Sequence, residues 1–285
     1  VTGAWGQLGH CFQAIETEFP QHKLLYATRS KVNINQPETL SNFYEEFPFE
    51  GIINCAAYTK VNQAENESKE AHQINVEGVK NLIAFAEIKK LKLVHFSSDF
   101  VFDGTKESLY QETSTPNPIN VYGQSKSEGE VLLQKAKCLN TIFRISWLFS
   151  PFGKNFVKTI INTSQEKKEI NVVNDQWGKP TYGIDLARAV LNLLEHPNLF
   201  KYKIYNFAQG PKTNWHEFAS NILALSGADC LLKPVDTSAY SFTAKRPFNV
   251  ILDTQKIEKT FSLSIRGWEE ALIDCVKKIR ENEVI

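Results

Sequence analysis

The chain has 285 residues, enough for one or two domains with a large buried core. It carries 32 basic and 32 acidic residues, and this zero net charge argues against a nucleic-acid-binding protein, whose phosphate contacts need a basic excess. The composition is 42% hydrophobic and 22% charged, which excludes a disordered chain. No apolar run approaches the roughly 18 residues that span a bilayer, so we expect no membrane segment.

Cysteine use predicts the compartment. The five cysteines are scattered, odd in number and without a CxxC pair, which is typical of free thiols in a reducing compartment and predicts a cytoplasmic protein. The N-terminal stretch shows no signal peptide. Methionine is absent, even at position 1, so we expect apolar residues of a first strand to precede Val1.

Short apolar runs alternate with amphipathic stretches in the first half of the chain. We predict strands over 23–27, 51–57, 91–97 and 141–149, and helices over 7–19, 37–47, 67–89 and 121–135. Such alternation implies parallel strands joined by right-handed crossovers. The predicted fold class is therefore α/β, a Rossmann-like doubly wound parallel sheet.

The rhythm changes after residue 149. We predict helices over 155–165, 184–194, 215–226, 254–261 and 268–283, a strand over 203–207, a strand and turn within 170–182, and extended chain over 246–252. We expect a dinucleotide-binding domain at 1–149 and a smaller α/β substrate lobe at 150–285, with about 184–207 returning to the first domain. A crevice between them, at the carboxyl ends of the strands, is the expected ligand site.

Glycines at GxxGxxG spacing follow the start of the chain. Gly3, Gly6 and Gly9 suit a tight turn, a close approach of backbone to a pyrophosphate, and close packing of helix on strand. With Gln7 and Leu8 they form the predicted cofactor loop, where a helix N-terminus meets the phosphates. The alternative is a helix-entry turn with incidental glycines.

The segment after the second predicted strand indicates the cofactor. An acidic residue usually binds the ribose 2′-hydroxyl of NAD about 20 residues after the glycines. This chain has Thr28, Arg29 and Ser30 there, which suit a 2′-phosphate and favour NADPH. NADH stays an alternative, with Arg29 as a solvated loop residue.

Tyr122 and Lys126 lie four residues apart, on one face of a predicted helix. An ammonium group beside a phenol favours phenolate, so we expect Lys126 to lower the pKa of Tyr122 and to make it a proton donor for a carbonyl oxygen. One such pair is no more than chance expects. However, Ser97 and Ser98 end an apolar strand at the predicted crevice, where a hydroxyl group could bond the same oxygen.

The chain resembles the extended short-chain dehydrogenase/reductases and, within them, the dTDP-4-dehydrorhamnose reductases. The stretches that carry the resemblance are TGAWGQLG (2–9), INCAAYTKVNQAE (53–65), HFSSDFVFDG (95–104), PINVYGQSKSEGE (118–130), FRISWLF (143–149), GKNFVKT (153–159), VNDQWGKPT (173–181) and KRPFNVILDTQKI (245–257). The last four lie in or near the expected sugar-nucleotide lobe.

The resemblance implies NADPH- or NADH-dependent reduction of the C4 keto group of dTDP-4-dehydro-L-rhamnose to dTDP-L-rhamnose. Tyr122 would donate the proton, Lys126 would hold the nicotinamide ribose, and Ser98 would polarise the keto group. Further cofactor contacts would be Asn33, Ile34, Ala56, Ala57 and Tyr58. Further substrate contacts would be Thr59, Val61, Asp99, Trp147, Asn155, Phe156, Lys158, Lys245 and Arg246.

Several positions depart from the family pattern. Ser98 replaces a usual threonine but keeps the hydroxyl group, and Phe100 replaces a usual tyrosine. Asn33 and Asn62 stand where aspartates are common. Cys11 occupies the position of a glutamate through which some members bind magnesium, so we carry no metal site over and leave a magnesium requirement open. A homodimer is also left open.

Other interpretations compete with this one. His95 is expected to be a core or cofactor-adjacent residue, and Cys55 to serve packing. An epimerase, another NDP-sugar 4-reductase or a 4,6-dehydratase shares the fold, but a dehydratase needs an acid–base pair and Asp99 is followed by Phe100, which transfers no proton. A non-catalytic regulatory subunit resembling the beta subunit of methionine adenosyltransferase is the alternative from another class.

Overall fold

The computed structural model describes residues 1–283. A parallel sheet forms the centre of the larger lobe, with strand order β1-β2-β3-β8. The strands are β1 (Gly51–Asn54), β2 (Lys92–Ser98), β3 (Asn140–Ile145) and β8 (Ile204–Phe207). Thr2 bridges to Asn54 on one side and to Ala27 on the other, so the strand order reverses at the start of the chain. The predicted α/β doubly wound fold is confirmed.

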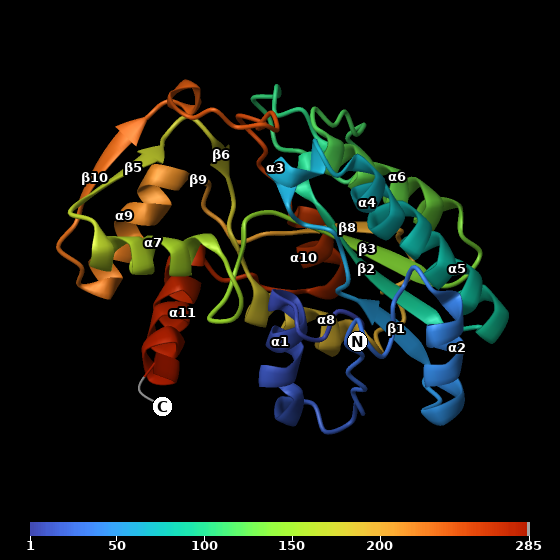
Figure 1. The fold of residues 1–285 in the computed structure, drawn as a ribbon. Helices are drawn as coiled ribbons and strands as arrows, with labels where there is room; N and C mark the ends of the chain where they lie inside the picture. The colour runs from blue at the N-terminus through green and yellow to red at the C-terminus, as the bar shows by residue number, and fades with distance from the viewer. Residues whose placement is uncertain (284–285) are drawn as a thin grey trace.

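Helices cover both faces of this sheet (Figure 1). On one face lie α2 (Pro37–Glu46), α4 (Ser68–His72), α5 (Gly78–Lys89) and α6 (Val121–Lys135), and on the other lie α1 (Gln7–Ala14) and α8 (Gly183–Leu193). The side chains of β2 point alternately to the two faces of the sheet, so this strand contributes to the core on each face. Leu93 packs in the core under α5, whereas Val94 and Phe96 pack in the core that contains Phe12 of α1.

The second lobe is built on a two-stranded parallel sheet. Its strands are β5 (Glu169–Val173) and β10 (Leu231–Val235), beside α7 (Phe156–Glu166), α9 (Trp215–Ser226) and α11 (Trp268–Glu283) (Figure 1). Short pairs connect the lobes, namely β4 (Leu148–Phe149) with β7 (Thr181–Tyr182) and β6 (Trp177–Gly178) with β9 (Thr213–Asn214). Helix α10 (Gln255–Phe261) contacts β8. The segment from α8 to β8 lies with the larger lobe.

Several predicted elements differ in extent. Residues 23–27 do not form the predicted strand; they make a single β-bridge, between Ala27 and Thr2. Their backbone partner in the described chain is the short segment from Val1 to Ala4. The predicted helix 7–19 ends at Ala14 and continues as a 3-10 turn (Glu16–Glu18). The strand 141–149 is divided into β3 and β4, and β10 had no counterpart in the prediction.

The predicted helix 67–89 contains a π-helical turn over Gln73–Glu77. Its Asn75 side chain accepts a hydrogen bond from the Tyr58 amide (2.9 Å) and donates to the Ser125 hydroxyl (2.9 Å). Through these two hydrogen bonds, Asn75 in the widened turn connects the segment after β1 to α6. Within residues 1–283, no helix has the length and apolar character needed to cross a membrane.

Candidate active site

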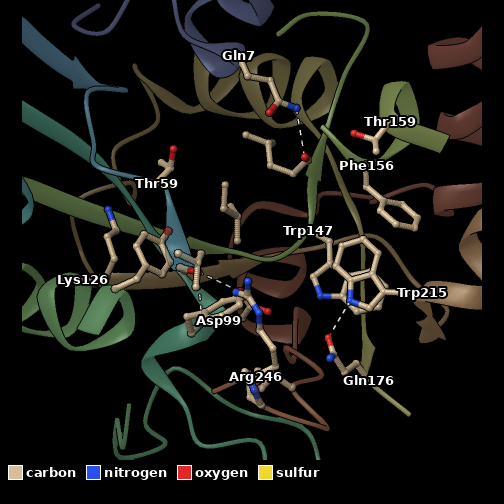
Figure 2. A pocket seen from close by; sticks show the side chains of 18 of the residues that line it. Gln7, Thr59, Asp99, Lys126, Trp147, Phe156, Thr159, Gln176, Trp215 and Arg246 are labelled. Atoms are coloured by element: carbon tan, nitrogen blue, oxygen red, sulfur yellow. Dashed lines mark hydrogen bonds between the residues drawn. The ribbon is translucent and has the colours of Figure 1, made fainter. Parts of the chain in front are cut away.

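A cavity of about 840 Å³ opens between the two lobes. The last residues of three neighbouring strands line it, namely Asn54, Ser98 and Ile145. Figure 2 shows Thr59 and Lys126 on the wall formed by the larger lobe, facing aromatic side chains of the opposite wall. The cavity therefore lies at the carboxyl ends of the parallel strands, where this class of sheet binds ligands.

The glycine loop borders this cavity. Gly3 has a φ of +62°, and a Cβ there would lie 2.7 Å from the Ala56 nitrogen, so the turn requires glycine. Helix α1 starts after Gly6 with no side-chain cap and no acidic residue in its first turn, which leaves its N–H groups free for an anion. Gly6, Gln7 and Leu8 line the cavity. This loop fits a pyrophosphate.

The predicted 2′-phosphate segment lies beside the glycine loop and outside the cavity wall. The Ala4 amide donates to the Ala27 oxygen (3.3 Å), which places residues 28–30 next to the loop. The Thr28 and Ser30 hydroxyls are 2.9 Å apart, and Arg29 is exposed. Asn33 and Ile34 follow in a turn, where the side chain of Ile34 is buried in the core.

Ser98, Tyr122 and Lys126 meet at the cavity wall. Ser98 ends β2 and accepts the Phe100 amide (3.2 Å), which starts a 3-10 turn, and its hydroxyl donates to Asp99 Oδ1 (3.0 Å). Tyr122 and Lys126 lie on the same face of α6, and the Tyr122 ring contacts the edge of Phe100 at 5.6 Å between centroids. The geometry brings together the hydroxyl, phenol and amine that the sequence predicted.

The ionisation of these groups differs from the expectation. Burial raises the pKa of Tyr122 to about 12, the Ser98 hydroxyl lowers it, and the Asp99 charge raises it further. Burial also raises the pKa of Asp99 to about 7 and lowers the pKa of Lys126 to about 8. The prediction that Lys126 lowers the pKa of Tyr122 is therefore wrong for this structure, because burial dominates and the Lys126 ammonium donates to the Phe96 carbonyl (2.7 Å).

Aromatic side chains form the opposite wall (Figure 2). The rings of Trp147 and Trp215 stack with 3.7 Å between centroids, and Phe156 lies 4.5 Å from Trp215. The Trp215 indole N–H donates to the Gln176 amide oxygen (3.2 Å). The sequence predicted Trp147 and Phe156 but not Trp215 or Gln176. No motif marks Trp215, which comes from α9. Gln176 lies between β5 and β6, within the stretch 173–181 that carries the resemblance, but nothing in that stretch singled it out.

Of the four basic and polar substrate contacts predicted in the second half of the chain, one lines the cavity and three do not. Arg246 lines the cavity, where its guanidinium lies over the Phe100 ring at 5.5 Å and donates to Asn62. Asn155, Lys158 and Lys245 do not line it. The Asn155 side chain caps α7 by accepting the Lys158 amide (3.3 Å), and the carbonyl of Lys245 accepts the Asn120 side chain (2.8 Å).

The segment after β1 enters the cavity in part. Ala57, Thr59 and Val61 line it, whereas the Tyr58 side chain is buried and donates to Glu67 (2.6 Å).

The Cys11 thiol is buried and donates to the Gln7 carbonyl (3.2 Å). Among residues 1–283, no group of three His, Cys, Asp or Glu side chains is arranged to hold a metal ion.

A Rossmann-like sheet, a glycine loop where the strand order reverses, and a Ser–Tyr–Lys group formed by the end of β2 and by α6 define the short-chain dehydrogenase/reductase class. Within that class, the family model described as RmlD substrate binding domain matches residues 1–281, and the chain belongs to this family.

Individual relatives agree with this assignment. A dTDP-4-dehydrorhamnose reductase of Aggregatibacter actinomycetemcomitans is 36% identical, over 95% of this chain and 96% of that protein. A crystal structure of a dTDP-4-dehydrorhamnose reductase from Clostridium acetobutylicum has a TM-score of 0.92 at 33% identity and covers 98% of both chains. The enzyme of that name from Bacillus anthracis, in complex with NADP, has a TM-score of 0.91 at 34% identity, over 97% of both chains.

Proposed function

We propose that this chain reduces the C4 keto group of dTDP-4-dehydro-L-rhamnose to give dTDP-L-rhamnose, with NADPH as the preferred reductant. The single observation that carries the proposal is the meeting of Ser98, Tyr122 and Lys126 at one cavity that the glycine loop also borders. The relatives' names support the sugar and the nucleotide, and the NADP complex of the Bacillus anthracis enzyme supports the cofactor.

The larger lobe binds the cofactor in this proposal. The free N–H groups at the start of α1 bind the pyrophosphate, and Arg29 with the Thr28 and Ser30 hydroxyls binds the 2′-phosphate. Lys126 holds the nicotinamide ribose at the carboxyl end of β2. NADPH, when bound, supplies the hydride that is added to C4 of the sugar.

The chain's own residues orient the substrate and move one proton. The Ser98 hydroxyl donates a hydrogen bond to the C4 oxygen, and the Tyr122 phenol gives that oxygen its proton as the hydride reaches carbon. Because the pKa of Tyr122 is about 12, the phenol is protonated at neutral pH and starts the cycle as an acid. The proton on Tyr122 is then replaced from solvent.

The second lobe holds the nucleotide part. Phe156 and the stacked indoles of Trp147 and Trp215 offer apolar faces to the base, and Arg246 offers a positive charge to the diphosphate. This arrangement supports the proposed division into a dinucleotide-binding domain at 1–149 and a sugar-nucleotide lobe at 150–285, with about 184–207 returning to the first domain. The five cysteines are unpaired, in support of a cytoplasmic location. A homodimer stays a prediction.

The proposal is tested by following NADPH oxidation at 340 nm with dTDP-4-dehydro-L-rhamnose. We expect turnover and formation of dTDP-L-rhamnose. The matched variant is Tyr122→Phe, which keeps the ring and removes the acid, and it should lower kcat by roughly 10²–10⁴-fold while NADPH still binds. Absence of turnover in a folded wild-type chain that binds NADPH would overturn the substrate assignment. Near wild-type turnover in Tyr122→Phe would overturn the role of Tyr122.

A further inference from the structure

His95 is a buried histidine that the proposed mechanism does not use. It lies on β2 behind the cavity wall with 2% of its surface exposed. Its Nε2 atom is 3.4 Å from the Lys126 amine, which also donates to the Phe96 carbonyl (2.7 Å). The position of the proton on the imidazole therefore acts directly on Lys126.

The other ring nitrogen of His95 faces Asn54. The Asn54 Oδ1 atom lies 3.2 Å from the Ala56 amide nitrogen and 2.6 Å from the Thr2 hydroxyl. A backbone N–H can only donate, so the Asn54 atom that it meets is the oxygen. The amide NH2 of Asn54 must then point at His95 Nδ1, 3.0 Å away, and donate to it.

This contact fixes the tautomer of His95. Burial and the nearby Lys126 charge hold the pKa of His95 well below its usual value, so the ring is neutral. A neutral imidazole whose Nδ1 accepts a hydrogen bond carries its proton on Nε2. The N–H group is therefore directed at Lys126. A charged ammonium offers only donors to that N–H, whereas a neutral amine has a lone pair that accepts it.

We propose that His95 is a positioning residue for Lys126, and that its Nε2–H, held in this orientation by Asn54, sets the pH at which Lys126 loses its proton. The pKa of Lys126 is kept at about 8, so the amine changes charge within the working pH range. Its role in turnover rests on the proposed reductase activity, whereas the tautomer itself does not.

Other groups around Lys126 act alongside His95. Glu130, one turn later on α6, raises the pKa of Lys126, and its carboxylate is held by Arg144 at 2.6 Å. Tyr122 lies one turn earlier and is protonated at neutral pH, and Asp99 acts on Tyr122. Of these groups, His95 places a ring nitrogen, Nε2, within hydrogen-bond distance of the Lys126 amine (3.4 Å).

The first test is the tautomer of His95 in the wild-type chain without cofactor. Long-range 15N–1H correlation spectra distinguish the two ring nitrogens, and His95→Gln assigns the signal among the six histidines. We expect a neutral ring with the proton on Nε2 at pH 7. A proton on Nδ1, or on both nitrogens, would overturn the proposal.

The second test reverses the tautomer. In Asn54→Asp, one carboxylate oxygen still accepts from Thr2 and Ala56, and the other accepts from His95 Nδ1. The ring proton then moves to Nδ1, and the Nε2 lone pair accepts from the Lys126 ammonium. We expect the step of kcat/KM near pH 8, at which Lys126 loses its charge, to move to higher pH by roughly one unit, the size of effect that a favourable neighbour has on a buried amine.

The new carboxylate also acts through its charge, so the control is the same substitution in a His95→Phe background. We expect a clearly smaller shift there, because the ring that transmits the change is missing. Equal shifts in both backgrounds would overturn the proposal. If Asn54→Asp does not fold, the wild-type tautomer alone decides it. Absence of wild-type turnover would overturn the proposed function and leave the tautomer measurement to decide this inference.

Discussion

The indole rings of Trp147 and Trp215 stack with their centroids 3.7 Å apart and their planes 10° apart. Trp147 has a φ of +47°, and Gly178 lies under its ring, where a Cβ would come within 2.8 Å. The segment between β3 and β4, which carries Trp147, is thereby connected to α9 of the second lobe. The stack is held on one side by close packing and on the other by the Gln176 hydrogen bond to Trp215.

Replacing Trp215 should weaken binding of the sugar nucleotide. Trp215→Ala removes one ring of the stack, and aromatic pairs contribute about 0.5–1.5 kcal/mol beyond their area. We expect KM for the sugar nucleotide to rise roughly tenfold, with KM for NADPH unchanged, in steady-state kinetics. Trp215→Phe keeps a ring and should lose less. A fall in kcat with an unchanged KM would contradict this role.

The pH dependence of kcat/KM should show two steps on the alkaline side. The pKa of Asp99 is raised to about 7, so its carboxyl is neutral below pH 7 and charged above it. That charge raises the pKa of Tyr122 and makes it a weaker acid. The pKa of Lys126 is lowered to about 8, so its positive charge is lost above pH 8. We expect activity to fall as the pH rises through 7 and again through 8.

The variant Asp99→Asn separates the two steps. It should remove the fall near pH 7 and leave the one near pH 8, whereas Asp229→Asn on an exposed loop should leave both in place. The measurement is kcat/KM between pH 5.5 and 9.5. Persistence of both steps in Asp99→Asn would show that another group titrates near pH 7.

Cofactor preference should depend on Arg29. Arg29 is exposed in the turn beside the glycine loop, where we propose that its guanidinium forms charge-assisted hydrogen bonds with the 2′-phosphate. Arg29→Ala should raise KM for NADPH roughly tenfold, equivalent to about 1.4 kcal/mol, and the loss should shrink at high salt. NADH in the same variant is the control and should be unaffected. Equal losses for both cofactors would contradict a 2′-phosphate contact.

Stability should depend on the buried pair of Glu130 and Arg144. Both side chains are about 1% exposed, with N–O distances of 2.9 and 2.6 Å. Glu130→Ala leaves an uncompensated buried charge and should lower the free energy of unfolding by roughly 3–5 kcal/mol in urea denaturation. Glu281→Ala, which breaks an exposed pair with Lys277, should cost about 1 kcal/mol or less. Similar losses in the two variants would refute the importance of burial.

The sequence determined the elements whose signal is local. The glycine spacing, the tyrosine and lysine four residues apart, and the serine at the end of an apolar strand were all predicted. The tertiary structure brings Ser98, Tyr122 and Lys126 to the same cavity. These predictions succeed because the carboxyl ends of parallel strands meet at one edge of a sheet, whatever the details of packing.

Only the tertiary structure decided the rest. Trp215 joins the cavity wall from a segment outside the motifs, and its hydrogen bond to Gln176 was not visible in the sequence. The same holds for the π-helical turn that contains Asn75, and for the bonds of Asn75 to Tyr58 and Ser125. The ionisation of Tyr122 was predicted in the wrong direction, because the spacing of two residues does not show how completely their surroundings exclude water. Burial and partner geometry arise from contacts between distant segments, and these set the energy of a charge at the site.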